Sequence, residues 1–506
     1  MAVFSPSSAA PSPPAAAPRS AGTPAPGVGA SSPATAFAPS VTVPLRFVVT
    51  GVLVLPAAAL LLAGRPDILA AYHYNQYTVA ATHLWVLGFL GSVALGAMYQ
   101  LVPVALETRL HSERLARWHF VLHLVGVAGM VWMFWRWDLK QVGHFGSALA
   151  AGVGLFAYNL GRTLRTVPRW NVVAWGITAA LGWLGLAVLA GLGIAAAKCS
   201  YDSLETLPPG HPLRPALMAL QATATWLGRF DPLGVMHAHA HLGGVGFFVM
   251  LIMAVSFKLV PMFTLSELQN PRRAGAALGL LNLGLAGVFL TLFLRSRWQP
   301  VAGGVVLAGL ALYGLELRAI LRARKRRVLD WGLRHFLVAL ALLAVVAPLG
   351  WVLGWPGLPV TLLTTQLETV YGWLGLAGVV SLTVLGFLYK IVPFQVWYHS
   401  YARQVGRFRV PALAELYSER LQVAGLGLVL AGVLGAALGA ALASEPIVRA
   451  GALALLAGLG VFLVNLGRML RHFWRPRLAP LPGAGPATKP AGVMPTPHTH
   501  EPQFDI

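Results

Sequence analysis

Three histidines stand at alternate positions where a long apolar segment begins. His237, His239 and His241 open the stretch VMHAHAHLGGVGFFVMLIMAVSFKLVP, residues 235–261, which is long enough to cross a bilayer. Imidazole is the commonest metal ligand among protein side chains and binds through either ring nitrogen. In hydrocarbon, any polar side chain must also find a partner. The stretch therefore indicates either a metal or cofactor site within the membrane or a set of polar contacts between helices.

Helix geometry divides the three side chains between two faces. At 3.6 residues per turn, successive side chains are rotated by about 100°, so His237 and His241 lie on nearly the same face and His239 points almost opposite. A helix built this way can bind ligands on both flanks. Hydrogen bonds between helices are the alternative role for each single histidine. We expect ligation for the set, because so many histidines exceed what polar contacts require.

The composition of the chain is that of a membrane protein. Of its 506 residues, 57% are hydrophobic and only 10% are charged, whereas about 25% are charged in ordinary soluble domains. The net charge of +21 does not indicate nucleic-acid binding, because Arg and Lys gather in short loops between apolar segments. The lipid bilayer is the expected partner. The single cysteine, Cys199, excludes a thiolate metal cluster, so His or carboxylate must bind any metal.

The chain contains about twelve apolar segments of membrane-spanning length. They centre near residues 52, 92, 126, 153, 184, 248, 283, 311, 343, 381, 431 and 458. Clusters of basic residues follow the even-numbered segments, at 109–117, 162–169, 272–273, 322–327 and 403–409. Because basic loops stay on the cytoplasmic side, we expect a multi-pass protein of the inner (plasma) membrane with both termini cytoplasmic. The histidines of the sixth segment then lie in the outer part of the membrane.

Both ends of the chain differ in composition from its middle. Residues 1–40 and 476–506 are rich in Pro, Ala and Gly and poor in bulky apolar side chains, so we expect disordered tails there. The first of them lacks the charged-then-apolar order of a secretory signal. Between the tails, residues 41–475 are expected to form one membrane domain.

An internal repeat relates three of the apolar segments. HLWVLGFLGSVALGAMYQLVP (83–103) aligns without a gap with HLGGVGFFVMLIMAVSFKLVP (241–261), which pairs His83 with His241. A third copy, WLGLAGVVSLTVLGFLYKIVP (373–393), ends in the same way but has Trp373 at the histidine position. The repeated motif predicts segments of equivalent structure.

A second motif follows two segments after each copy. YNLGRTLR (158–165), LELRAILR (315–322) and VNLGRMLR (464–471) occur in that order. The joint order of two motifs in three copies favours repetition over chance. We therefore predict an all-α polytopic membrane protein of about twelve transmembrane helices in three pseudo-repeated four-helix units, with repeats at about 41–168, 169–327 and 328–475.

These features together resemble the catalytic subunit of the haem-copper oxidase superfamily. The shared features are twelve segments, termini inside, four-helix units, and a histidine near the outer end of the second segment followed by an apolar run to Tyr-x-Leu-Val-Pro. The resemblance is closest to the nitric oxide reductase and C-family oxidase branches, or to a divergent relative such as the NnrS family. It extends over about residues 40–475, although its specific motifs are confined to 83–103 and 235–261.

The resemblance implies haem, but the family's ligand set is incomplete here. His83 matches the axial histidine that the family's second segment supplies to a low-spin haem. The family's tenth segment supplies a His-x-His pair, and its sixth and seventh segments supply copper ligands. In this chain the tenth segment has no histidine before His399, and the seventh has none, whereas the histidine cluster lies in the sixth.

The simplest site joins His83 to His241 or His237 as the two axial ligands of a haem. His239 would then serve a second haem or a metal, copper or non-haem iron, on the other flank. The sequence does not give the haem type, nor whether one or two haems are bound. His144 is a weaker candidate, as a further ligand or a propionate partner, and Glu368 as a proton relay or cation ligand.

Three further sets of polar residues are expected to have roles other than binding a metal or the haem iron. His73, just before the second segment, is expected at the membrane interface, and Arg229 and Asp231 are expected to pair with each other or with haem propionates. His119 and His123, four residues apart on the third segment, are also expected to be structural.

The resemblance implies a haem-binding integral membrane redox protein that serves electron transfer, nitric oxide or oxygen chemistry, or sensing. A cytochrome c or a quinol would donate electrons, and a partner membrane subunit would supply what this chain lacks. Whether the chain is an enzyme stays open; if it is, it is an oxidoreductase. The alternatives are a multi-span transporter, which would ordinarily have broken helices and a midplane site, and a non-catalytic membrane subunit with structural histidines.

Overall fold

The computed structural model describes residues 37–198, 204 and 207–480. Most of both predicted tails and the lone Cys199 lie outside this part of the chain. Five residues of the predicted C-terminal tail, 476–480, are described, and there Ala479 exchanges two backbone hydrogen bonds with Arg409 (2.9 and 3.2 Å). The described chain therefore continues beyond the last helix as a segment paired with the loop around Arg409.

The described residues form helices and isolated bridges but no strand. Eleven helices are long and apolar enough to cross a membrane. Eight of them are single: α2 (Thr42–Gly64), α6 (Glu113–Arg136), α8 (Val172–Lys198), α13 (Pro271–Phe293), α14 (Gln299–Arg322), α15 (Trp331–Leu353), α18 (Glu419–Ala441) and α19 (Glu445–Leu470). A further helix, α7 (Leu139–Leu164), has spanning length but is less apolar. The prediction of an all-α polytopic membrane protein of about twelve helices is confirmed.

The other three spanning helices share an unusual compound form, in which an α-helix passes into a π-helix and then back into an α-helix. They are α4 (Gln76–His83), η1 (Leu84–Gly91) and α5 (Ser92–Ala105); α11 (Pro232–His241), η2 (Leu242–Val249) and α12 (Met250–Thr264); and α16 (Leu362–Trp373), η3 (Leu374–Val380) and α17 (Ser381–Tyr401). Each π-helix begins directly after one of the three aligned positions, His83, His241 and Trp373. π-Helical turns are rare and concentrate at functional sites.

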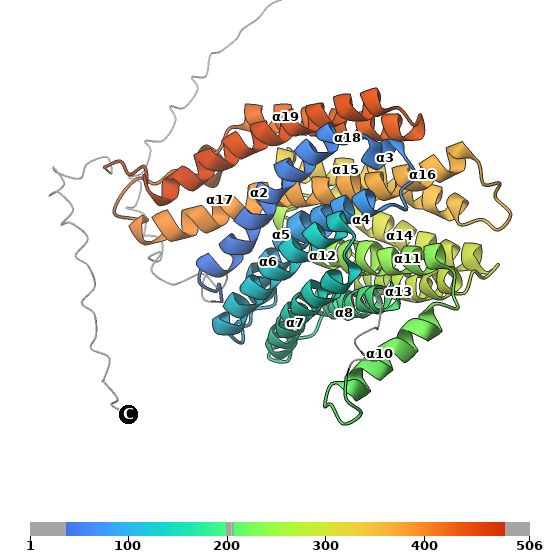
Figure 1. Ribbon diagram of the computed structural model, residues 1–506. Helices are drawn as coiled ribbons and strands as arrows, with labels where there is room; N and C mark the ends of the chain where they lie inside the picture. Colours follow the sequence, from blue (N-terminus) through green and yellow to red (C-terminus); the bar gives the residue numbers. More distant parts are fainter. Residues whose placement is uncertain (1–36, 199–203, 205–206, 481–506) are drawn as a thin grey trace, which may run out of the picture.

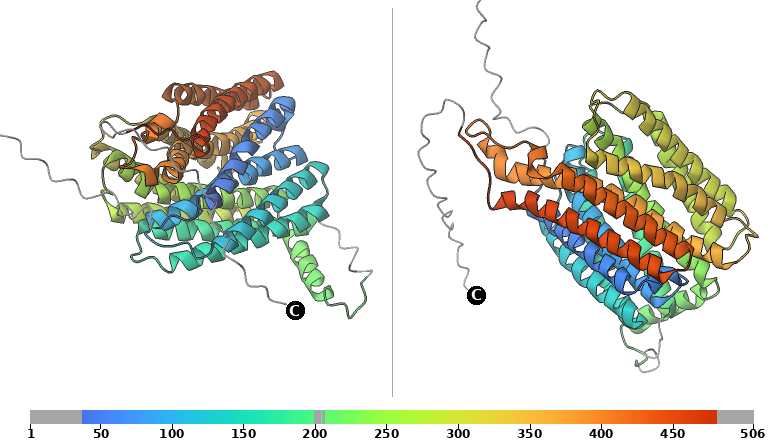
Figure 2. Two further views of the ribbon diagram at one scale, coloured as in Figure 1. Left: turned by 90° about the vertical axis from the view of Figure 1, so that its left-hand side faces the viewer. Right: turned by 90° about the horizontal axis from the view of Figure 1, so that it is seen from above.

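The compound helices lie in the middle of the bundle. In an apolar 18-residue stretch of each compound helix, 61–78% of the residues are buried within the protein. The corresponding share is 17–50% for the eight single spans. The remaining long helices surround them in an antiparallel bundle, and the short helix α10 (Arg214–Leu227) stands apart beside α8 (Figures 1 and 2). The helices that carry the aligned motifs therefore have little contact with lipid and much contact with other helices.

Three tight hairpins, α6–α7, α13–α14 and α18–α19, form much of the outer layer, and glycines let their helices approach closely. In α18–α19, a Cβ atom at Gly432 would collide with the backbone of Leu455, and one at Gly451 with that of Ala436. In the same way, Gly126 lies against Leu149 in the α6–α7 hairpin, and Gly284 lies against Val306 in the α13–α14 hairpin. Small residues at such crossings give van der Waals contact between backbones, which is the main source of helix association in lipid.

The second repeated motif places one buried polar side chain in each hairpin. Asn159 and Asn465 each accept a hydrogen bond from the backbone N–H of a helix-capping serine, Ser112 (3.0 Å) and Ser418 (2.8 Å). The aligned Glu316 accepts from the backbone of Asn270 (2.9 Å). All three side chains are fully buried. Each satisfies backbone groups that the start of a helix leaves unpaired, and so holds that helix against the next one.

The close α18–α19 crossing predicts that substitutions of two glycines of α18 differ sharply in their effect on stability. We expect Gly432→Val to lower stability by about 1–3 kcal/mol, because the new side chain would force the helices apart. Gly427→Val is the matched control, since a Cβ atom there meets nothing within 4 Å. Thermal unfolding of both variants in detergent measures the difference, and equal melting temperatures would contradict the packing described.

Candidate functional site

A cavity of about 460 Å³ lies between the three compound helices, from their opening α-helical turns into their π-helices, and reaches α6, α7, α8 and α15. Its volume is in the usual range for small-molecule and cofactor sites. The wall is mostly apolar, and its titratable side chains include His73, His83, His123, His237, His239, His241 and Glu368. The four histidines of the main predicted ligand set, His83, His237, His239 and His241, therefore line one cavity.

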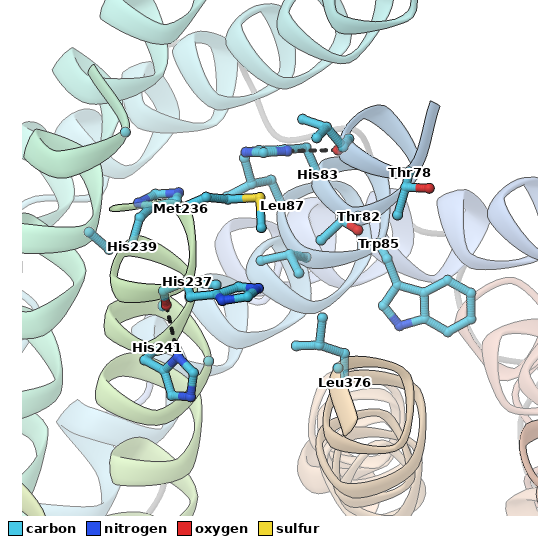
Figure 3. A pocket seen from close by; sticks show the side chains of 18 of the residues that line it. Thr78, Thr82, His83, Trp85, Leu87, Met236, His237, His239, His241 and Leu376 are labelled. Carbon is cyan, nitrogen blue, oxygen red and sulfur yellow. Dashed lines mark hydrogen bonds between the residues drawn. The ribbon is translucent and has the colours of Figure 1, made fainter. Parts of the chain in front are cut away.

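The imidazole rings of His83 and His239 lie opposite each other in this cavity (Figure 3). Their planes are within 16° of parallel and their ring centres are 6.5 Å apart. Two imidazoles that bind one metal ion from opposite sides, with bonds of about 2.0 Å, have ring centres about 6.3 Å apart. The histidine opposite His83 is thus His239, and not His237 or His241 as expected from the sequence.

The hydrogen bonds of these rings favour ligation by His83. Its Nδ1–H donates to the carbonyl oxygen of Val79 (2.8 Å), because a carbonyl can only accept. In a neutral imidazole this leaves the lone pair on Nε2, and metal-bound histidines commonly hold their second nitrogen in this way. The Nδ1 atom of His239 is buried without a hydrogen-bond partner, so its ring has unused capacity for a polar partner.

His241 faces the opposite flank of the same helix. Its Nδ1–H donates to the carbonyl oxygen of His237 (2.8 Å), and its Nε2 lies 3.1 Å from the hydroxyl of Tyr371 on α16. His239, by contrast, packs toward Gly191 on α8. The three histidines therefore point to two sides of the helix, as their spacing predicts.

His73, His237 and Glu368 form a second group in the cavity. The Nε2 atoms of the two histidines are 3.1 Å apart, and Nε2 of His73 is 3.9 Å from a carboxylate oxygen of Glu368. One potential ligand atom from each residue lies within 4.8 Å of the other two. The three residues come from three different parts of the chain: the segment before α4, α11 and α16.

His73, which is expected from the sequence at the membrane interface, lies in the cavity wall, where its side chain is 14% exposed. Burial lowers its pKa below the ordinary histidine value, which favours the neutral form that can bind a metal. Sequence analysis missed this residue because its position depends on distant contacts. Gln366 of α16 donates to the carbonyl oxygen of Ala70 (2.9 Å), and Thr78 donates to that of Ile68 (2.9 Å), which together fix the turn before His73.

Other sequence candidates lie elsewhere. His144 is exposed on α7, where it contacts Gln141 (3.3 Å), and it does not line the cavity. Asp231 pairs with Arg295 (3.0 Å) and not with Arg229.

The buried histidines of α6 each have one hydrogen-bonding partner on α5, and the second ring nitrogen of each is buried without one. His119 and His123 lie within hydrogen-bonding distance of Tyr99 (3.0 Å) and Ser92 (2.9 Å) on α5. These contacts fit the structural role expected for both residues. His123 is also one of the residues that line the cavity.

Three known proteins are similar to this chain over short stretches. No family model matches the chain. It is 36% identical over 70 residues to a cytochrome c oxidase subunit 1 homolog, bacteroid, of Bradyrhizobium diazoefficiens, and 33% over 70 residues to a cytochrome c oxidase subunit 1 homolog of Agrobacterium tumefaciens. It is 30% identical over 124 residues to cytochrome c oxidase subunit 1 of Rhodobacter capsulatus.

The matches cover 14%, 14% and 20% of this chain and only 13%, 13% and 23% of the three relatives. The chain thus matches less than a quarter of the length of each relative. Together with the helical membrane fold, these partial matches indicate a relationship to subunit I of the haem-copper oxidases.

Proposed function

We propose that the chain is a haem-binding integral membrane redox protein in which His83 and His239 would hold one haem iron between their rings. The observation that carries the proposal is the near-parallel pair of rings whose centres are 6.5 Å apart. The partial similarity to cytochrome c oxidase subunit 1 supports it independently, since those proteins are named as oxidase subunits.

The residues around the pair fit a haem. A macrocycle needs an apolar cavity, and the wall of this cavity includes apolar side chains such as Leu87, Leu149 and Phe134. The Phe134 ring lies 4.6 Å from the His83 ring, centre to centre, and limits its rotation. When bound, haem iron supplies one-electron redox chemistry. The chain would hold the two imidazoles in place, exclude water and set the apolar surroundings on which the haem's potential depends.

The proposed function is limited to electron transfer through this haem. The seventh span, α13, contains no histidine, so the copper ligands that the oxidase resemblance implies there are missing. The Nε2 atom of His241 faces the Tyr371 hydroxyl, and we assign no haem to it. The cavity's apolar wall also fits a haem better than it fits the polar midplane site expected of a transporter.

We further propose that the protein lies in the plasma membrane with both termini cytoplasmic. Basic residues gather at one end of the bundle, in or beside the segments that join α5 to α6, α7 to α8, α12 to α13, α14 to α15 and α17 to α18, and are fewer at the other end. The histidine cavity is at the basic-poor end, so it would lie in the outer half of the membrane.

The haem pairing predicts different spectra for different histidine variants. Wild-type protein purified from cells supplied with haem should have a Soret band and a low-spin spectrum. We expect His83→Ala and His239→Ala each to lower haem affinity at least about tenfold, because even ligand-supporting residues cost that much. His144→Ala, at an exposed position on α7, should retain full haem content. A wild-type protein without a Soret band would refute the proposal, as would loss of low-spin haem in His241→Ala but not in His239→Ala.

The packing of α8 on His239 gives a test that leaves every histidine in place. A Cβ atom at Gly191 would lie 3.1 Å from the His239 ring, so Gly191→Leu should displace the imidazole and reduce bound haem. Gly185→Leu on the same helix meets nothing within 4 Å and should bind haem normally. Haem content per chain measures both, and equal content would argue against ligation by His239.

The proposed orientation can be tested with single cysteines in a Cys199→Ala background. Val360 and Val328 are both highly exposed (89% and 74%) and lie in loops at opposite ends of α15. A membrane-impermeant maleimide added to intact cells should label Val360→Cys and not Val328→Cys, whereas both should react after permeabilisation. The reverse labelling pattern would place the termini outside.

A further inference from the structure

We propose that His73, His237 and Glu368 bind one divalent transition-metal ion. This site lies in the same cavity as the proposed haem pair but uses different side chains, so it does not depend on haem. The three residues converge from the segment before α4, from α11 and from α16, and His73 and His237 are 164 residues apart in sequence.

The distances suit an ion between the three side chains. Two ligand atoms that are each about 2.1 Å from an ion, at angles of about 90–110°, lie about 3.0–3.4 Å apart. The Nε2 atoms of His73 and His237 are 3.1 Å apart, within this range. The 3.9 Å between His73 and Glu368 would close through a small rotation of the flexible glutamate side chain.

The local charges favour a cation. Among the described residues, the half-buried Glu368 carboxylate has an ion-pair contact with His73 and none with Lys or Arg. The nearby carboxylate of Asp231 is already paired with Arg295 at 3.0 Å. A direct hydrogen bond between the two imidazoles would leave the Glu368 charge uncompensated, whereas a dication would bind both neutral rings and the carboxylate at once.

The ligand chemistry selects a class of ions. Two imidazoles with one carboxylate suit Fe²⁺, Cu²⁺ or Zn²⁺, whereas Mg²⁺ and Ca²⁺ prefer oxygen ligands. Three protein ligands leave coordination positions open, and the ion would present them to the cavity, where water or a small ligand could bind.

The surrounding fold holds the three ligands in register. Gln366, two residues before Glu368, binds the carbonyl oxygen of Ala70, three residues before His73. The same hydrogen bond therefore links the helix that carries the carboxylate to the turn that carries a histidine. Such support fixes ligands before the ion arrives and lowers the cost of binding.

Zn²⁺ alone is a suitable probe, because it needs no redox control. Full-length protein in detergent would be stripped with a chelator, equilibrated with Zn²⁺, desalted and assayed for metal per chain. We expect one Zn²⁺ in the wild type and at least tenfold weaker binding in Glu368→Gln and in His73→Asn. Matched substitutions at exposed positions, Glu107→Gln and His144→Asn, should bind as the wild type does. Absence of Zn²⁺ from the wild type, or equal binding by the ligand variants, would overturn the site.

The haem proposal and the metal proposal can fail separately. The Soret band should persist in Glu368→Gln, which also shows that this variant folds, while His83→Ala should lose haem and keep Zn²⁺. Zn²⁺ binding by a wild type that has no Soret band would support the metal site alone. A Soret band in a wild type that holds no Zn²⁺ would refute it.

To identify the ion, Cu²⁺ loaded into the wild type should give an electron paramagnetic resonance spectrum with splitting from two imidazole nitrogens. The same splitting in His73→Asn would contradict ligation by that residue.

Discussion

Imidazole groups inside an apolar bundle must have partners, and this requirement organises the centre of the protein. Each unpaired polar group in hydrocarbon costs several kcal/mol. His83 and His241 each satisfy one nitrogen with a carbonyl oxygen four residues earlier on their own helix, which leaves the other nitrogen directed away from the helix. What lies beyond that second nitrogen determines the chemistry: for His83 it is the ring of His239, and for His241 the hydroxyl of Tyr371.

The three π-helices lie next to the residues that make these contacts. Each of the three begins immediately after the residue at the aligned position, where a histidine or Trp373 stands. Trp373 donates a hydrogen bond to the carbonyl oxygen of Val433 (2.9 Å), so the third compound helix uses the same position to hold α16 against α18. Because π turns concentrate at functional sites, their recurrence next to the histidines in two compound helices supports a ligand-binding role there. The third π-helix follows Trp373, which packs α16 against α18.

Much of the fold follows from simple patterns in the sequence. Apolar length predicts the spans, and the 3.6-residue period predicts that His239 and His241 face opposite flanks. The repeated YNLGRTLR-type motif marks Asn159, Glu316 and Asn465, whose common task of binding the start of a neighbouring helix emerges only in three dimensions. The ring opposite His83 is that of His239, where the sequence predicts His237 or His241, and this difference has a physical reason. Alignment matches His83 with His241 as equivalent positions, but equivalent positions of repeated units face equivalent surroundings, and so they need not face each other. The sequence does not indicate that His73 reaches the cavity, because a long-range hydrogen bond from Gln366 to Ala70 positions the turn before it.

The central claim is that two nearly parallel imidazoles, from α4 and α11, bind one haem iron. Electron paramagnetic resonance of the oxidised protein tests it most directly, because the spectrum of low-spin ferric haem depends on its axial ligands and on the angle between their planes. The 16° between the rings of His83 and His239 predicts a rhombic low-spin signal typical of two parallel imidazoles. A purely high-spin signal, or the strongly axial low-spin signal of perpendicular imidazoles, would contradict the account.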